Sequence, residues 1–181
     1  MPSDNLTTLA EMALSNARRQ IEATGTLTFR TALQLPDGRV MWTDLPEKLA
    51  PIMNDHQLKT ILFNALRLAV AESEATAVII VTDSWFGVPT EKQKRMAEED
   101  PEGLCRLAKS LDLTSMIEQG LCIRTEAVTV TVQPPEEALI LNQLYNRHEG
   151  GRRIAWGERI NHRCPQSEYS GKTKMYGVQV N

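Results

Sequence analysis

The sequence predicts an α+β fold with a largely antiparallel sheet of five or six strands and helices packed mainly on one face. Three observations support this prediction. Apolar residues recur at helical spacing in some segments, they alternate with polar residues in others, and two pairs of alternating segments are joined by turn-forming residues. The order helix, hairpin, helix, strand, helices, long strand, hairpin is typical of helices packed on an antiparallel sheet.

The first two elements are a helix and a hairpin. Residues 6–21 place apolar side chains three and four positions apart, and Gly25 is the expected left-handed cap of this helix. Residues 26–35 then alternate, and a turn at Pro36-Asp37-Gly38 returns the chain through residues 39–43.

A second long helix is expected after a loop that contains two prolines. Asn54 is the predicted N-cap, with Gln57 reaching back to it. The helix carries a continuous apolar stripe that we expect to lie across the sheet as its main cover. This stripe consists of Leu58, Ile61, Leu62, Ala65, Leu68 and Ala69.

A buried strand is predicted over residues 77–82, where a continuous apolar run precedes an acid, a hydroxyl and an indole. The charged residues 86–100 then predict an exposed, mobile connection with a short helix that Thr90 begins. Another helix is expected to open at Asp100-Pro101.

The long strand over residues 121–133 changes the parity of its apolar positions partway along. Either a β-bulge near residues 125–127 or a strand buried on both faces at one end would produce this pattern. Residues 136–147 fit a helix start or a hairpin arm, and we favour the hairpin because Ile154, Trp156 and Ile160 need a partner strand.

We therefore expect one domain over residues 1–160, followed by a polar, partly flexible C-terminal extension over residues 161–181. The extension can add only a short edge strand, from Met175 to Val180.

Composition excludes few classes of protein. The net charge is −3 and the pI is near 5.7, which disfavours general nucleic-acid binding. A signal peptide and a membrane span are not predicted, so we expect a cytoplasmic protein whose three cysteines are reduced. The sequence contains no glycine-rich nucleotide-binding loop, and we therefore expect no cofactor.

The best candidate pocket lies where the buried strand leaves the core. Its predicted residues are Asp83, Ser84, Trp85, Arg124 and Glu126. Two carboxylates, Asp83 and Glu126, could hold a divalent cation in a metal-dependent hydrolase of phosphoesters. The competing interpretation is structural, with Asp83 capping a turn and Glu126 in an ordinary surface pair.

A basic region over residues 147–174 is the second candidate site. Arginines and an aromatic residue are the side chains that single-stranded nucleic acid requires, although solvated arginines around a core tryptophan need no ligand. The candidate contacts, to nucleic acid or to a protein partner, are Arg147, Arg152, Arg153, Trp156, Arg159 and Arg163.

Zinc-binding residue types also occur in and near the basic region. His148, His162 and Cys164, with Cys122 as a fourth ligand, have the right chemistry, but their spacing does not fit a zinc site, so we predict no metal.

The favoured function is a non-enzymatic binding or assembly protein that self-associates, since sheet edges such as residues 39–43 and the C-terminal strand invite pairing. The metal-dependent hydrolase and the nucleic-acid binder stay open as alternatives. The sequence identifies no small-molecule ligand.

Overall fold

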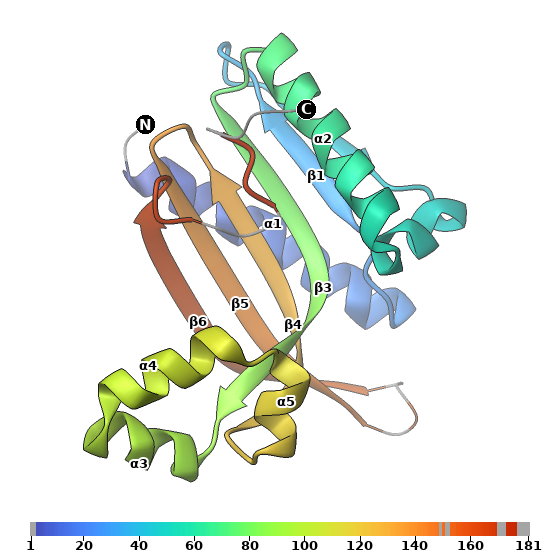
Figure 1. Cartoon of the computed structure of the whole chain (residues 1–181). Helices are drawn as coiled ribbons and strands as arrows, with labels where there is room; N and C mark the ends of the chain where they lie inside the picture. The colour runs from blue at the N-terminus through green and yellow to red at the C-terminus, as the bar shows by residue number, and fades with distance from the viewer. Residues whose placement is uncertain (1–2, 149, 151–152, 170–172, 177–181) are drawn as a thin grey trace. The chain divides into compact units, whose positions relative to one another are not determined.

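The computed structural model describes residues 3–148, 150, 153–169 and 173–176 (Figure 1). The chain forms two compact units. The larger consists of Met1–Asp83 with Val128–Asn181, and the smaller of Ser84–Ala127. The sheet is antiparallel and has the strand order β2-β1-β3-β4-β5-β6, which confirms the predicted α+β class. Within the described residues, every helix is too short or too polar to cross a membrane.

Helix α1 (Ser3–Thr24) packs its apolar side chains against one face of the sheet in the larger unit. Leu6, Ala10 and Ala17 are all buried, as their helical spacing in the sequence predicts for one face of an amphipathic helix. Gly25 ends the helix with a φ of 75° and donates its N–H to Ile21 O at 2.8 Å, as the sequence predicted.

Strands β1 (Arg30–Gln34) and β2 (Val40–Asp44) form the predicted hairpin. Gly38 has a φ of 85° in the turn, a conformation that other residues rarely adopt. Strand β1 also pairs with β3 (Ala77–Pro89), and that pairing extends as far as Arg30 opposite Val81.

A short helix, η1 (Glu47–Asn54), precedes α2 (His56–Glu72), and this changes the predicted N-cap. Asp55, not Asn54, caps α2: its carboxylate accepts the N–H groups of Gln57 at 2.8 Å and Leu58 at 2.9 Å. The reason is that Asn54 is the last residue of η1, which leaves Asp55 as the extended residue before α2.

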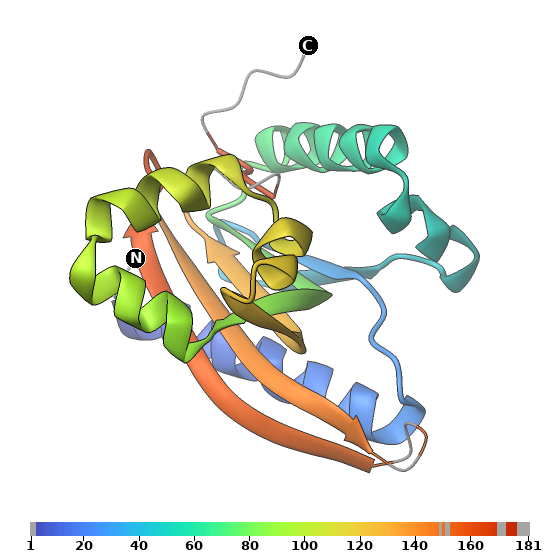
Figure 2. The same ribbon diagram turned by 60° about the horizontal axis from the view of Figure 1, so that its bottom comes forward.

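Helices α1 and α2 lie against opposite faces of the sheet (Figures 1 and 2). Strand β3 alternates between them, because Ile79 and Val81 join the core with α1 while Val78 and Ile80 join the core with α2. The larger unit is therefore a three-layer arrangement rather than a sheet covered mainly on one face.

The stripe of α2 does not face the sheet as expected. Phe63 and Val70 make the buried contact, whereas Leu58, Ile61 and Leu68 are 45%, 64% and 51% exposed. Apolar residues cover more of the helix circumference than the sheet can bury, so part of the stripe faces outward.

The smaller unit contains the end of β3, three helices and the beginning of β4 (Cys122–Gln133). Strand β3 does not end at Thr82, since it continues to Pro89 with a half-exposed pattern. The three helices are α3 (Glu91–Glu99), α4 (Pro101–Ser110) and α5 (Leu113–Glu118). The predicted caps are confirmed, because Thr90 accepts from Gln93 N and Asp100 from Gly103 N.

Strands β5 (Glu137–His148) and β6 (Arg153–Pro165) form the predicted second hairpin. The register shifts between Gln143 and Tyr145, so β6 carries one extra residue there. The extra residue shifts the alternation of side chains along β6, so residues after the bulge point to the opposite face of the sheet. Ile160 therefore does not share a face with Trp156, although the sequence predicted that it would. In β4, residues 130–133 are buried on both faces.

Strand β6 runs across residue 160, the expected end of the domain, and continues to Pro165, which pairs with Glu137. The Gln166 N–H then donates to Glu136 O at 2.8 Å. Met175 is buried and Tyr176 packs against the α2 core. The described part of the extension therefore packs on the larger unit. Of the predicted edge strand from Met175 to Val180, the residues from 177 onward lie outside the described residues.

Candidate functional site

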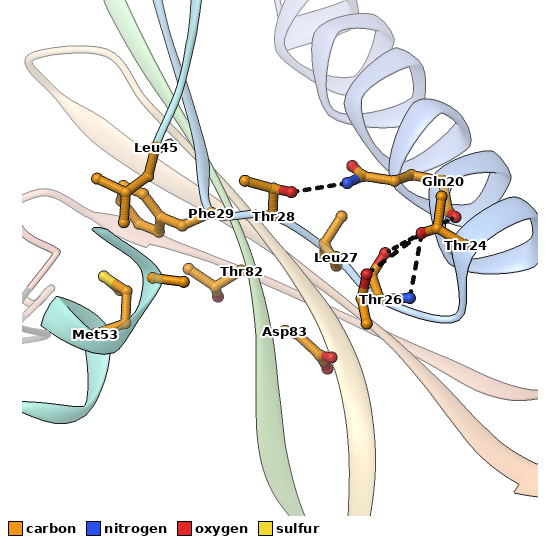
Figure 3. A pocket seen from close by; sticks show the side chains of 11 residues that line it. Gln20, Thr24, Thr26, Leu27, Thr28, Phe29, Leu45, Met53, Thr82 and Asp83 are labelled. Carbon is orange, nitrogen blue, oxygen red and sulfur yellow. Dashed lines mark hydrogen bonds between the residues drawn. The ribbon is translucent and has the colours of Figure 1, made fainter. Parts of the chain in front are cut away.

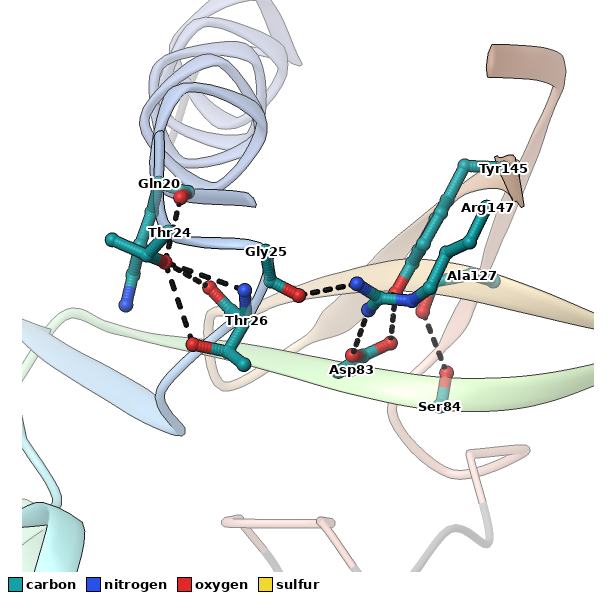
Figure 4. A network of polar contacts seen from close by, with 9 residues as sticks. All are labelled: Gln20, Thr24, Gly25, Thr26, Asp83, Ser84, Ala127, Tyr145 and Arg147. Carbon is teal, nitrogen blue, oxygen red and sulfur yellow. Dashed lines mark hydrogen bonds and ion pairs between the residues drawn. The ribbon is translucent and has the colours of Figure 1, made fainter. Parts of the chain in front are cut away.

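Asp83 is the centre of a polar network in the larger unit (Figure 4). Its Oδ1 accepts the hydroxyl of Tyr145 at 2.8 Å, and Arg147 Nη2 lies 3.6 Å from its Oδ2. Arg147 Nη2 also donates to the Tyr145 hydroxyl at 2.9 Å. Asp83 therefore does not cap a turn, because β3 continues beyond it and its carboxylate is used across the sheet.

The network also reaches the end of α1. Arg147 Nη1 donates to the carbonyl oxygen of Gly25, directly after the last residue of that helix. A cation at this position offsets the partial negative charge of the helix C-terminus. Tyr145 is fully buried, so its hydroxyl needs partners, and Asp83 and Arg147 supply them.

A cavity of about 560 Å³ opens beside Asp83, within the larger unit (Figure 3). It lies where β1 and β3 stop pairing, since Thr82 and Asp83 come directly after the last paired residue, Val81. The loop between α1 and β1 leaves the sheet at this point and, together with η1, encloses the space.

The two walls of the cavity differ in chemistry. One wall carries threonines and an amide: Thr24 ends α1, Thr26 and Thr28 lie in the loop that follows, and Gln20 Nε2 donates to Thr28 Oγ1 at 3.0 Å. The other wall is apolar and consists of Phe29, Leu45, Ala50 and Met53, while Leu27 lies nearer the threonines (Figure 3). A cavity of this size with a few polar groups is typical of small-molecule sites.

The other four predicted pocket residues lie in the smaller unit. Ser84 Oγ donates to the backbone carbonyl of Ala127 at 3.3 Å, which uses the hydroxyl as a structural donor. The Arg124 guanidinium lies 3.7 Å from the centre of the Trp85 ring, as a cation–π pair. Glu126 follows on the same strand, β4. Among the residues that the structure describes, no three His, Cys, Asp or Glu side chains are grouped to hold a metal ion.

Arg147, Arg159 and Arg163 of the basic region have acidic partners. Arg159 pairs with Glu11 of α1, and Arg163 Nη1 lies 3.6 Å from Glu137 Oε2. Such pairing reduces the positive charge that the region presents to a phosphate. Arg153 is exposed, and Arg152 lies outside the described residues.

Trp156 packs against α1. Its indole N–H donates to Glu22 Oε1 at 2.6 Å, and the Arg18 guanidinium lies 4.6 Å from the centre of its ring. The tryptophan is thus engaged by the protein, with its ring also 5.4 Å from that of Tyr145.

Two of the proposed zinc ligands are buried cysteines. Burial raises the pKa of the Cys164 thiol, and the nearby Glu168 raises it further. A raised pKa keeps the sulfur protonated, which opposes both metal binding and nucleophilic attack. Cys122 is buried in the smaller unit.

A second surface feature adjoins the exposed stripe of α2. A groove of about 180 Å³ runs along Leu62, Ala65 and Leu66, with Leu45 and Pro46 on its other side. The apolar surface therefore continues from the helix into the groove.

Comparison with known protein families, with curated proteins and with solved structures finds no match for this chain. The sequence had singled out Asp83 but not the threonines beside it, because the loop at residues 26–29 resembles an ordinary strand start. Tyr145 and Arg147 contact Asp83 although they follow it by 62 or more positions in the sequence, and short-range patterns cannot reveal such contacts.

Proposed function

We propose that this protein is a non-enzymatic assembly protein that pairs with a second copy of itself through α2. One observation supports this proposal above the others, namely the exposed stripe of Leu58, Ile61 and Leu68 in a helix whose opposite side is already buried. Contiguous exposed apolar surface of this kind marks interaction sites in stable proteins.

The spacing of the stripe suits an antiparallel pair of helices. Leu58, Ile61, Ala65 and Leu68 follow the alternating three- and four-residue spacing of a helix–helix seam. In a two-fold pair, Leu58 of one copy would lie opposite Leu68 of the other, and Ile61 opposite Ala65. The small side chain of Ala65 allows the two helices to approach closely at the centre.

The side chains beside the seam do not oppose an antiparallel pair. One flank is uncharged, with Gln57, Asn64 and Ala71 along it. Lys59 is one helical turn before the buried Phe63 and therefore lies on the sheet-facing side of α2, away from the seam. No lysine of one copy is thus placed against a lysine of the other at the seam.

The helix alone makes a small interface. Its 17 residues extend over about 25 Å, which provides less than the roughly 800 Å² per partner of a standard interface. The adjoining groove and the 53% exposed Met41 of β2 would have to contribute as well. We therefore expect a dimer that dissociates on dilution.

The test is sedimentation analysis of the full chain and two variants at about 10 and about 200 µM, because dimerisation depends on concentration. Ile61→Lys places a charge in the centre of the seam and is expected to be monomeric at both concentrations. Thr60→Lys adds the same charge to the exposed polar side of α2 and should dimerise like the unaltered protein.

A monomeric unaltered protein at the higher concentration would refute the proposal, and so would a dimer of the Ile61→Lys variant. A spectrum of the folded state for each variant establishes that the substitution acts on association and not on folding.

A further inference from the structure

We propose that the cavity beside Asp83 binds an uncharged small molecule that has an aromatic or other flat apolar part and one hydrogen-bond donor. This inference does not rest on the pairing of two copies through α2, because the cavity contains no residue of the α2 stripe, although it shares Phe29 and Leu45 with the adjoining groove. It extends the expected binding function to a specific place and class of ligand.

The apolar part of the ligand follows from the wall formed by Phe29, Leu45 and Met53. The Phe29 ring can stack with a flat molecule, and the flexible, polarisable Met53 side chain can adapt to its outline. Figure 3 shows these side chains on one side of the cavity and Asp83 on another.

The hydrogen-bond donor follows from Asp83. An ionised carboxylate has about four sites at which it can accept a hydrogen bond. The side chain of Asp83 is 31% exposed even with Tyr145 and Arg147 bound to it, so solvent and ligand can reach it. A hydroxyl or N–H group of the ligand is the natural complement to such an acceptor.

The absence of net ligand charge follows from the surroundings of that carboxylate. Arg147 balances the charge of Asp83 and also offsets the C-terminal end of α1 at Gly25. The cavity lining contains no lysine, arginine or histidine within the described residues, so the charge of an anionic ligand would have no cation in the lining to balance it. A neutral ligand loses less on leaving water than an ion does.

Three indole probes, each methylated at the ring nitrogen so that the ring has no donor of its own, separate these requirements. The N-methyl form of indole-3-ethanol is uncharged and has a hydroxyl donor on its side chain, that of indole-3-acetate carries a carboxylate in the same place, and that of 3-ethylindole has neither. The names below refer to these N-methyl forms. Titrations followed by two-dimensional NMR of the full chain should show indole-3-ethanol binding, with the largest shifts at Leu27, Phe29 and Thr82. Because a hydrogen bond to a charged group contributes about 1.5 kcal/mol or more, 3-ethylindole should bind about tenfold more weakly. Indole-3-acetate should bind more weakly still.

Two variants test the site itself. Ala50→Phe fills the cavity from η1 and should abolish these shifts, whereas Leu49→Phe changes a neighbouring exposed residue outside the lining and should not. Asp83→Asn keeps the shape but removes the charge, and it should reduce the preference for indole-3-ethanol over 3-ethylindole.

Shifts located elsewhere in the protein would overturn the inference. Equal affinity for the alcohol and the acetate, or no binding of any probe up to its solubility limit, would overturn it too. Unchanged discrimination in the Asp83→Asn variant would show that the carboxylate does not receive the donor.

Discussion

The buried side chain of Gln133 holds the C-terminal segment to the end of β4. Its Oε1 accepts the backbone N–H of Met175 at 3.0 Å, and its Nε2 donates to the carbonyl oxygen of Thr173 at 2.7 Å. The amide thus satisfies two backbone groups of a segment that lies outside every strand. This is why the described part of the predicted flexible extension has a fixed place in the larger unit.

Replacing Gln133 with leucine should destabilise the protein by about 3 kcal/mol, because the Met175 N–H and Thr173 carbonyl then lose their buried partners. Urea unfolding measures the change. Lys174→Ala keeps every backbone contact of the same segment and should cost far less. Equal losses in the two variants would contradict this role of Gln133.

Tyr176 should make stability depend on pH in strongly alkaline solution. Burial raises the pKa of its hydroxyl from the ordinary value of 10 to about 12. Between these two values the folded state keeps a proton that the unfolded state has lost, so the free energy of unfolding falls as the pH rises through this window. Below it, neither state is ionised and this contribution is constant.

The variant Tyr176→Phe tests that dependence. It loses the hydrogen bond from the hydroxyl to Ala75 O at 2.9 Å, which should cost about 1 kcal/mol near neutral pH. Unfolding at about pH 9 and about pH 11 should show a smaller loss of stability in the variant than in the unaltered protein. If the variant and the unaltered protein lose the same stability between these two pH values, the alkaline dependence comes from groups other than Tyr176.

The contacts of Asp83 should contribute to stability through both partners. Tyr145→Phe removes a buried hydroxyl that links Asp83 and Arg147, and we expect a loss of about 2 kcal/mol in urea unfolding. Arg147→Lys keeps the charge but cannot reach Gly25 and Tyr145 with a planar fork. It should therefore also destabilise the protein, and a lysine variant as stable as the unaltered protein would show that charge alone matters.

Replacing Gly103 with alanine should not stabilise α4, although this substitution stabilises most helices. Alanine in a helix usually stabilises by about 1 kcal/mol over glycine. Here a Cβ on Gly103 would collide with Asp100 Oδ2, while Asp100 Oδ1 accepts the Gly103 N–H at 2.8 Å. The added methyl group would displace the cap of α4 and cancel the gain.

A double-mutant cycle measures this coupling. Gly103→Ala should slow hydrogen exchange in α4 when Asp100 is already alanine, and should not slow it in the unaltered protein. The same effect in both backgrounds would mean that the cap and the methyl group do not compete.

Local signals account for the part of the fold that could be predicted. Caps and turns depend on backbone groups within a few positions, so they can be predicted from the sequence. Examples are the caps Thr90 and Asp100 and the glycines Gly25 and Gly38. The two hairpins follow for the same reason. Asn54 was a wrong cap because η1 extends one residue into the loop, a difference that propensity cannot resolve.

The sequence by itself determined α1, α2 and the two hairpins, and it located Asp83 where β3 leaves the core, but it did not reveal η1, α5 or the continuation of β3 to Pro89. Tertiary structure alone decided which apolar residues of α2 face the sheet, where the bulge reverses the face of β6, and what surrounds Asp83. The physical reason is the distance along the chain. Arg147 meets Gly25 across 122 positions, and such a contact exists only after the strands have packed.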